Sequence, residues 1–320
     1  MDRGFILQPT YMIEGGRAVI HLFGVTDEGV TFVVRDTRVR PSFFIRREDL
    51  SRAKPLLEAA RGESAERSDL PSDPPSNSLA DSAKGPTAAE PFPRVGTQTW
   101  TTMDGEEAAE IFLAVPPDVP PLRDRLRGAG VDCLEADLPF VTRYLCDRGL
   151  RGAVGIEGDF RPGRRVDRIY ENPTLMPTEF EPELGVLSLD IETDLKAESV
   201  RSFALFGHLP QGGRIAEVHY RRPEGAPGGP LPEEGQKGGF FFEHPDEPAL
   251  LAALVRRVRE IDPDVLTGWN VIDFDLRVLG QAFSRCGVPF HLGRADLPCR
   301  VWARDDSWMT SRATVHGRVA

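Results

Sequence analysis

The stretch LGVLSLDIETDLK, Leu184 to Lys196, ends an apolar run with the carboxylates of Asp190, Glu192 and Asp194. Residues two apart on a strand project from the same face, so Asp190 and Glu192 are expected side by side. Like charges at such a place repel each other and are costly to desolvate, unless a divalent cation lies between them. Carboxylate oxygens suit Mg²⁺ or Mn²⁺. The alternative is a solvated strand end with Asp194 starting a turn, unless another carboxylate joins from elsewhere.

A second acidic segment, LTGWNVIDFDLRVL, covers residues 266–279. Its first residues predict a strand that ends in a loop at Asn270, and Asp275 falls in the first turn of the following helix. Helix capping accounts for Asp273. It accounts less well for Asp275, whose apolar neighbours indicate a partly enclosed position. Asn270 stands at the carboxyl end of the strand, where α/β proteins place ligand-facing groups.

The elements that must position these residues fall into two predicted domains. Residues 1–180 contain short strands and a few helices between Gly, Asp and Pro, which indicates a mixed β/α (α+β) domain. Within it, residues 62–96 are rich in Ser, Pro, Asp and Ala and predict a disordered insertion. Residues 170–183, with several prolines, predict a connector. Residues 184–320 alternate strands with amphipathic helices, which is typical of an α/β domain.

The totals restrict the class of protein. A net charge of −11 argues against a simple basic DNA-binding module, although bound divalent cations would still let an acidic site hold nucleic acid. The four cysteines form no Cys-x-x-Cys pair, so reduced thiols in a cytoplasmic protein are expected. The chain contains no apolar run long enough to span a bilayer, and no membrane partner is expected.

The sequence DIET, followed downstream by GWNVIDFDLRVL, resembles the first two exonuclease motifs of the family B DNA polymerases. The segments GFIL and GVDCLEADLPFVTRYL resemble the N-terminal domain of bacterial members of that family. The resemblance covers most of the chain outside residues 62–96. It implies an N-terminal polymerase domain followed by a ribonuclease-H-like 3′→5′ exonuclease domain that uses four carboxylates.

The same resemblance implies roles for the acidic residues. Asp190 and Glu192 match the first motif, and Asp275 matches the second. These three would be catalytic metal ligands for two Mg²⁺ or Mn²⁺ ions, of the kind that activate the attacking water and stabilise the leaving oxygen.

The implied partner is DNA, as a single-stranded 3′ end or a primer–template. Asn270, Phe274 and Thr193 would lie near that end, although core packing is an equal alternative for Phe274. The implied setting is proofreading during DNA replication and repair, with a nucleotide-binding polymerase and possible contact to a sliding clamp through another part of the protein.

The third exonuclease motif of the family, Tyr-x-x-x-Asp, has no counterpart after Asp275, because all four tyrosines precede that residue. The segment His291–Asp296 has the spacing of a histidine variant of that motif. Its flanking prolines and its glycine exclude the required helix. We therefore expect a truncated N-terminal fragment that is inactive as an exonuclease by itself.

Two other functions stay open at this point. The chain could be a non-catalytic module, derived from the polymerase, that binds nucleic acid or a protein partner. It could also be a nuclease that completes its site with a residue from a second chain.

Overall fold

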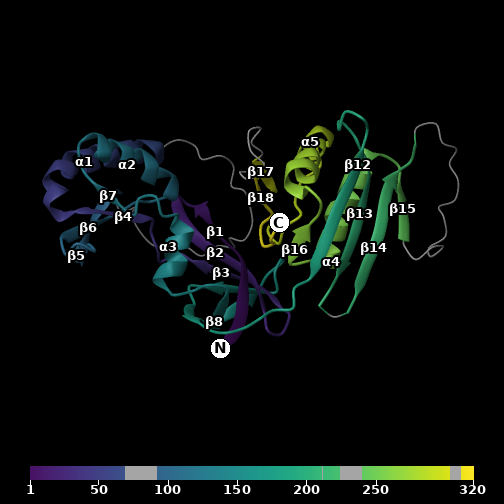
Figure 1. The fold of residues 1–320 in the computed structure, drawn as a ribbon, viewed down its shortest axis with the longest axis horizontal. Coiled ribbons are helices and arrows are strands. Elements are labelled where there is room, and N and C mark those ends of the chain that lie inside the picture. Colours follow the sequence, from purple (N-terminus) through teal and green to yellow (C-terminus); the bar gives the residue numbers. More distant parts are fainter. Residues whose placement is uncertain (69–91, 211, 224–239, 303–310) are drawn as a thin grey trace.

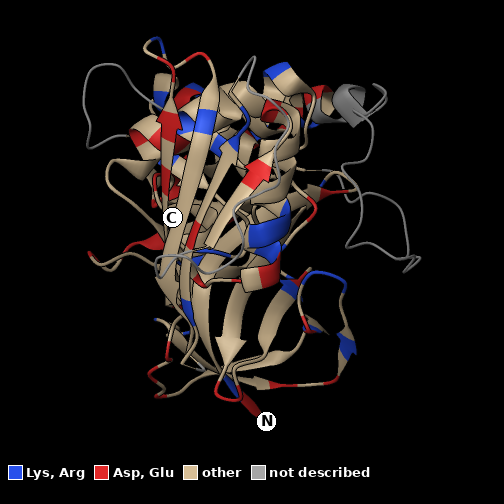
Figure 2. Cartoon of the chain, turned by 90° about the vertical axis from the view of Figure 1, so that its right-hand side faces the viewer, with Lys and Arg blue, Asp and Glu red and all other residues tan. Residues whose placement is uncertain are grey.

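The computed structural model describes residues 1–68, 92–210, 212–223, 240–302 and 311–320. Two β-sheet halves lie side by side, and the C-terminus returns between them (Figure 1). In the view of Figure 2, basic and acidic residues are interspersed along the drawn elements.

The N-terminal half is built on a seven-stranded sheet in the order β11-β8-β1-β2-β3-β10-β9. The long hairpin of β1 and β2 forms its centre, because nearly every residue of β2 is buried. The helix α3 covers one face, where Phe140 and Tyr144 join the core. The bounds are β1 Asp2–Glu14, β2 Arg17–Thr26, β3 Thr31–Asp36, β8 Ala153–Glu157, β9 Phe160–Pro162, β10 Arg168–Glu171, β11 Thr174–Pro177 and α3 Phe140–Asp147.

A smaller four-stranded sheet, in the order β5-β6-β4-β7, belongs to the same half. The helices α1 and α2 pack on it around Phe43, Ile45 and Ile111, which are fully buried. Its elements are β4 Ser42–Arg46, a 3-10 turn Arg47–Asp49, α1 Leu50–Ser68, β5 Arg94–Thr101, β6 Glu107–Phe112, a 3-10 turn Pro116–Asp118, α2 Val119–Gly128 and β7 Cys133–Leu134.

The C-terminal half contains a five-stranded sheet in the order β15-β14-β13-β12-β16, with α4 and α5 packed against it. The strand β12 pairs antiparallel with β13 and parallel with β16. The bounds are β12 Val186–Thr193, β13 Val200–His208, β14 Arg214–Arg221, β15 Phe240–His244, α4 Glu247–Ile261, β16 Val265–Thr267, α5 Arg277–Cys286, β17 Arg300–Trp302 and β18 Arg312–Thr314.

Two predicted segment boundaries differ from the structure. Helix α1 continues to Ser68, past the predicted start of the insertion at Gly62, and β5 begins at Arg94. Residues 69–91 of the predicted insertion lie outside the described residues. The predicted connector 170–183 begins inside the sheet, because β10 ends at Glu171 and β11 pairs with β8. Its irregular sequence could not reveal this strand, since the pairing partner is distant in the chain.

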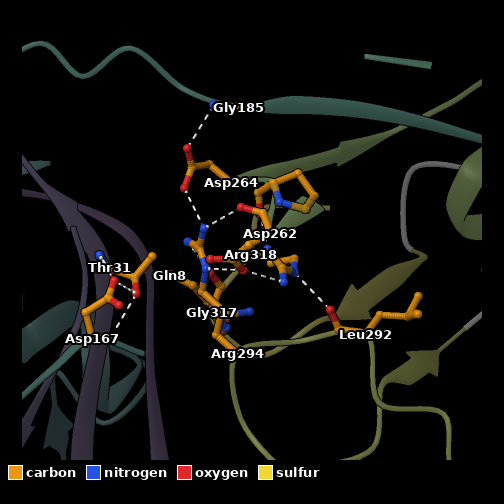
Figure 3. Close-up of polar contacts among 11 residues, drawn as sticks. Gln8, Thr31, Asp167, Gly185, Asp262, Asp264, Leu292, Arg294, Gly317 and Arg318 are labelled. Atoms are coloured by element: carbon orange, nitrogen blue, oxygen red, sulfur yellow. Dashed lines mark hydrogen bonds and ion pairs between the residues drawn. The ribbon is translucent and has the colours of Figure 1, made fainter. Parts of the chain in front are cut away.

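A buried ionic network lies at the starts of β12 and β16 (Figure 3). It includes Arg318, close to the C-terminus. Arg294 donates from Nη2 to Asp264 Oδ1 at 2.9 Å and from Nε to Asp262 Oδ1 at 3.0 Å. Asp264 Oδ2 accepts from the Gly185 N–H at 2.8 Å, just before β12. Arg318, 2% exposed, donates to the carbonyls of Pro263 and Leu292. The network therefore fixes the starts of β12 and β16 relative to each other.

The network also reaches the N-terminal sheet. Gln8 on β1 accepts from the Gly317 N–H at 2.7 Å and donates to the Val315 carbonyl at 3.3 Å. A second contact is hydrophobic, because Ala295 packs in one cluster with residues of β2, β3 and β10. The two halves are therefore joined by both polar and apolar contacts.

Residues His291–Asp296 form no helix, as predicted. Asp296 instead accepts from Arg164 and from Arg165 in the loop before β10. All four cysteines are free thiols, as the sequence predicts. In the described part of the chain, none of the helices has the length and apolar character needed to cross a membrane.

Candidate active site

The strand β12 presents two carboxylates on one face. Asp190 and Glu192 are exposed, whereas Leu189 and Ile191 are buried in the core of the C-terminal half. This is the alternation that the sequence predicts for a strand with one buried face. Asp194 follows as the start of a turn, where its Oδ1 accepts from the Glu198 N–H at 2.9 Å. Its bonds to backbone N–H groups lower the pKa of Asp194, so the turn accounts for this residue.

The neighbouring strand β16 ends at the same edge of the sheet, because it runs parallel to β12. Gly268, directly after β16, passes very close to β12: a Cβ there would lie 2.4 Å from the Leu189 carbonyl oxygen. Asn270 then adopts a left-handed conformation with φ of 58°, and residues Val271–Leu276 form a π-helical turn. The sequence predicts an ordinary first helical turn here. Wide turns of the π type are often found at functional sites.

Asp275 lies in that turn and points back to β12. It is 1% exposed, and its Oδ1 accepts the Ile191 N–H at 3.0 Å. This bond attaches a buried carboxylate to the backbone between Asp190 and Glu192. The pKa of Asp275 is raised to about 6, mainly by burial and also by the negative charge of Asp190. The backbone hydrogen bonds act in the opposite direction.

The three predicted metal ligands lie in the same region but do not form one compact group among the described residues. Asp190 lies within electrostatic range of Asp275, and Glu192 shares the exposed face of Asp190. Over the residues that the structure describes, no three His, Cys, Asp or Glu side chains form a compact cation-binding group. Asp275 is thus buried, while Asp190 and Glu192 face solvent. Asp275 uses one oxygen for the Ile191 N–H, and like charges keep the exposed carboxylates in solvent.

The donor set nevertheless suits Mg²⁺ or Mn²⁺. It consists of carboxylate oxygens alone, which hard divalent cations prefer. Asp190 and Glu192 are open to solvent, and the raised pKa of Asp275 is the change that a nearby cation would reverse. The residues that could hold an ion are therefore Asp190, Glu192 and Asp275.

The three predicted DNA-contact residues differ in how open they are. Asn270 is exposed, and its carbonyl accepts the Phe274 N–H at 3.0 Å. Phe274 is half-buried and packs against the core of the C-terminal half, which favours the packing alternative. Thr193 is half-buried at the end of β12, where its hydroxyl donates to the Asp194 carbonyl at 2.9 Å. Asn270 is thus the most accessible of the three.

Sequence reasoning assigned no role to Trp269. This side chain is 92% exposed in the loop after β16, between Gly268 and Asn270. Leu195, after β12, is also fully exposed. Trp269 and Leu195 each follow a strand of the pair β16 and β12, in the loops next to which Asp275 and Asp190 stand in the sequence. The signal in the sequence was an aromatic residue in a loop that follows a strand.

Comparisons with known proteins show what this chain is similar to. Residues 232–299 match the family described as DNA polymerase family B, exonuclease domain. The chain is 35% identical over 174 residues to DNA polymerase II of Escherichia coli (strain K12), covering 53% of this chain and 20% of that protein. It is 26% identical over 295 residues to a DNA polymerase of Archaeoglobus fulgidus, covering 91% of this chain and 32% of that protein.

A solved structure, the family B DNA polymerase of the hyperthermophilic archaeon Pyrobaculum calidifontis, matches 99% of this chain and 36% of its own chain. The TM-score is 0.68 at 23% sequence identity, so this likeness shows the fold. It confirms the predicted fold class, a mixed N-terminal region followed by a ribonuclease-H-like exonuclease region. The chain spans about a fifth to a third of the length of the relatives named above. These matches show that the chain is similar to the N-terminal and exonuclease regions of family B DNA polymerases.

Proposed function

We propose that this chain forms part of the metal-dependent 3′→5′ exonuclease of a DNA polymerase, which removes nucleotides from a single-stranded 3′ end. The observation that carries the proposal is the hydrogen bond from the Ile191 N–H to Asp275, which attaches a buried carboxylate beside the exposed Asp190. Bound Mg²⁺ or Mn²⁺ would supply the neutralising charge that phosphodiester hydrolysis requires.

The residues of this chain would divide the work by their exposure. The exposed Asp190 and Glu192 would bind the ion on its solvent side. The buried Asp275 would bind it on the side that faces the core. The cellular setting that this implies is proofreading during replication or repair in the cytoplasm. A sliding clamp would bind through another part of the polymerase.

Cation binding by the 320-residue chain tests the proposal without requiring turnover. We expect saturable Mn²⁺ binding in a titration followed by electron paramagnetic resonance. Asp190→Asn is expected to weaken it by at least about tenfold, or about 1.4 kcal/mol, because one charged ligand is removed. The matched control is Glu198→Gln, which removes an exposed carboxylate from the turn after β12. Equal Mn²⁺ affinity in the two variants would contradict the assignment.

Trp269 is proposed as a stacking surface for a base at the 3′ end, since its indole is exposed in the loop that leads from β16 to Asp275. A base stacked on an aromatic ring contributes about 1–3 kcal/mol. Trp269→Ala is therefore expected to weaken binding of a short single-stranded oligonucleotide by about five- to a hundredfold in fluorescence anisotropy.

Two variants serve as controls for the stacking proposal. Trp269→Phe keeps an aromatic face and is expected to retain most of the affinity. Trp100→Ala removes an exposed indole from β5 in the N-terminal half and is expected to change little. An alanine variant at Trp269 that binds as tightly as the phenylalanine variant would exclude stacking.

A non-catalytic module that binds nucleic acid or a protein partner is the second candidate. The observation that favours it is the lack, among the described residues, of a compact group of three metal-binding side chains. It predicts DNA binding that is the same with and without Mn²⁺ and that does not change in Asp190→Asn or Asp275→Asn.

A further inference from the structure

A second cluster of charge lies where the two halves of the chain meet. Arg164 and Arg165 come from the loop between β9 and β10 of the N-terminal sheet, and Arg259 comes from the last turn of α4. All three surround Asp296. Arg165 Nε donates to Asp296 Oδ1 at 2.7 Å, and Arg164 also donates to this carboxylate. Arg259 Nη2 lies 3.9 Å from Asp296 Oδ1, too far for a hydrogen bond.

Among the described residues, the charges that these contacts bring together do not balance. Three guanidinium groups share one carboxylate, and the imidazole of His291 lies within electrostatic range of Arg259 and Arg165. Burial lowers the pKa of Arg259, and the charges of Arg165 and Arg164 lower it further, against Asp296. Burial, followed by the charge of Arg259, lowers the pKa of His291.

Arg259 also has unsatisfied donors. Its Nε and Nη2 atoms are buried, and within the described part of the chain neither has a hydrogen-bond partner. A buried N–H without an acceptor costs about 1–3 kcal/mol, and more in a charged group. The position at the helix C-terminus favours a positive charge but leaves these donors unused. The missing component is an acceptor with negative charge.

The cluster is held rigidly. Val166 and Ala295, which are neighbours in sequence of Arg165 and Asp296, are buried together in one apolar cluster at the junction of the two halves. Packing of these two neighbours therefore fixes the backbone that carries Arg165 and Asp296. The cluster and the carboxylates lie at opposite ends of β16, because α4 leads into the start of that strand, whereas Asp275 follows its end.

We propose that Arg164, Arg165, Arg259 and His291 bind a phosphate group of a nucleic-acid strand at the junction of the two halves. Guanidinium groups present N–H donors in a planar fork that matches phosphate oxygens. The choice of a nucleic acid over free phosphate rests on the proposed exonuclease function. Phosphate contacts of this kind position a strand without reading its sequence.

Salt dependence of oligonucleotide binding tests this site. For single strands, the slope of log affinity against log salt concentration becomes shallower by about 0.7 for each phosphate group that the protein no longer neutralises. We expect Arg259→Met to reduce the slope by about this amount in fluorescence anisotropy with a thymidine oligonucleotide. Arg164→Gln is the second variant, since its side chain is 71% exposed and its removal leaves the core intact.

The matched control is Arg256→Gln, one turn earlier on α4, whose side chain is 65% exposed and near Glu260. It removes the same charge from the same helix, so an effect of net charge alone would appear in all three variants. Equal slopes in Arg259→Met, Arg164→Gln and Arg256→Gln would overturn the proposal. Thermal unfolding in phosphate against chloride gives the second readout. Phosphate could raise the unfolding temperature of the native chain but not that of Arg259→Met, while the salt slope for the oligonucleotide stays the same in both. In that case the site binds only free phosphate, and the nucleic-acid part of the proposal is overturned.

This test is independent of the exonuclease assignment. Asp190→Asn removes a carboxylate at the opposite end of β16, and its readout is Mn²⁺ binding rather than the salt slope. If Asp190→Asn fails to alter Mn²⁺ binding while Arg259→Met still lowers the slope, the exonuclease proposal fails and the phosphate site stands. If only the Mn²⁺ result holds, the phosphate site fails.

Discussion

Arg294→Met is expected to lower the free energy of unfolding by about 3–5 kcal/mol, the range for removing one partner of a buried ion pair. Arg294 is 3% exposed and Asp264 is 5% exposed. Without the guanidinium, the Gly185 N–H is the one hydrogen-bond donor that the buried Asp264 retains among the described residues. Urea unfolding followed by fluorescence measures the loss.

A double variant separates the effect of the unpaired charge from that of the altered packing. Arg294→Met with Asp264→Asn removes both charges, while the amide oxygen at position 264 still accepts the Gly185 N–H. We expect about 1–3 kcal/mol of the loss to be recovered, because no uncompensated buried charge remains. Arg300→Met, at an exposed position on β17, is the control and should stay within about 0.5 kcal/mol of the native chain. The role of the network is refuted if Arg294→Met costs no more than that.

This network illustrates what the sequence could not predict. Asp264, Arg294 and Arg318 stand far apart in the chain, and each alone resembles an ordinary surface charge. The same holds for Asp296, whose arginine partners come from the loop before β10. The burial of a charged residue can be predicted only when its partners are known, and those partners depend on the tertiary fold.

The features of the site that could be predicted follow from local sequence patterns. The exposure of Asp190 and Glu192 follows from strand alternation, and the enclosure of Asp275 follows from its apolar neighbours. The π-helical turn at residues 271–276 was not predictable, because it depends on how closely Gly268 approaches Leu189 on another strand. The position of Asp275 beside Asp190 was therefore an expectation from the resemblance, whereas its contact with Ile191 required the structure.

Asp275→Asn is expected to stabilise the chain at alkaline pH, although it removes a proposed metal ligand. The folded-state pKa of Asp275 is raised from 3.8 to about 6. Ionisation therefore opposes folding above pH 6, and this penalty disappears as the pH falls below the ordinary value near 4. A shift of this size corresponds to about 2–3 kcal/mol. The amide oxygen of Asn can still accept the Ile191 N–H, so the supporting contact survives.

Urea unfolding in a chelator, at pH 8 and again at pH 4, measures this difference. The variant should exceed the native chain by about 2–3 kcal/mol at pH 8 and match it at pH 4. The matched control is Asp273→Asn, two residues away and half-buried, which should change stability by less than about 0.5 kcal/mol at either pH. Added Mn²⁺ should narrow the gap at pH 8, because a bound cation stabilises only the native carboxylate. If the variant is no more stable than the native chain at pH 8, the ionised Asp275 does not destabilise the fold. Its burial would then give no reason to expect a cation at the end of β12.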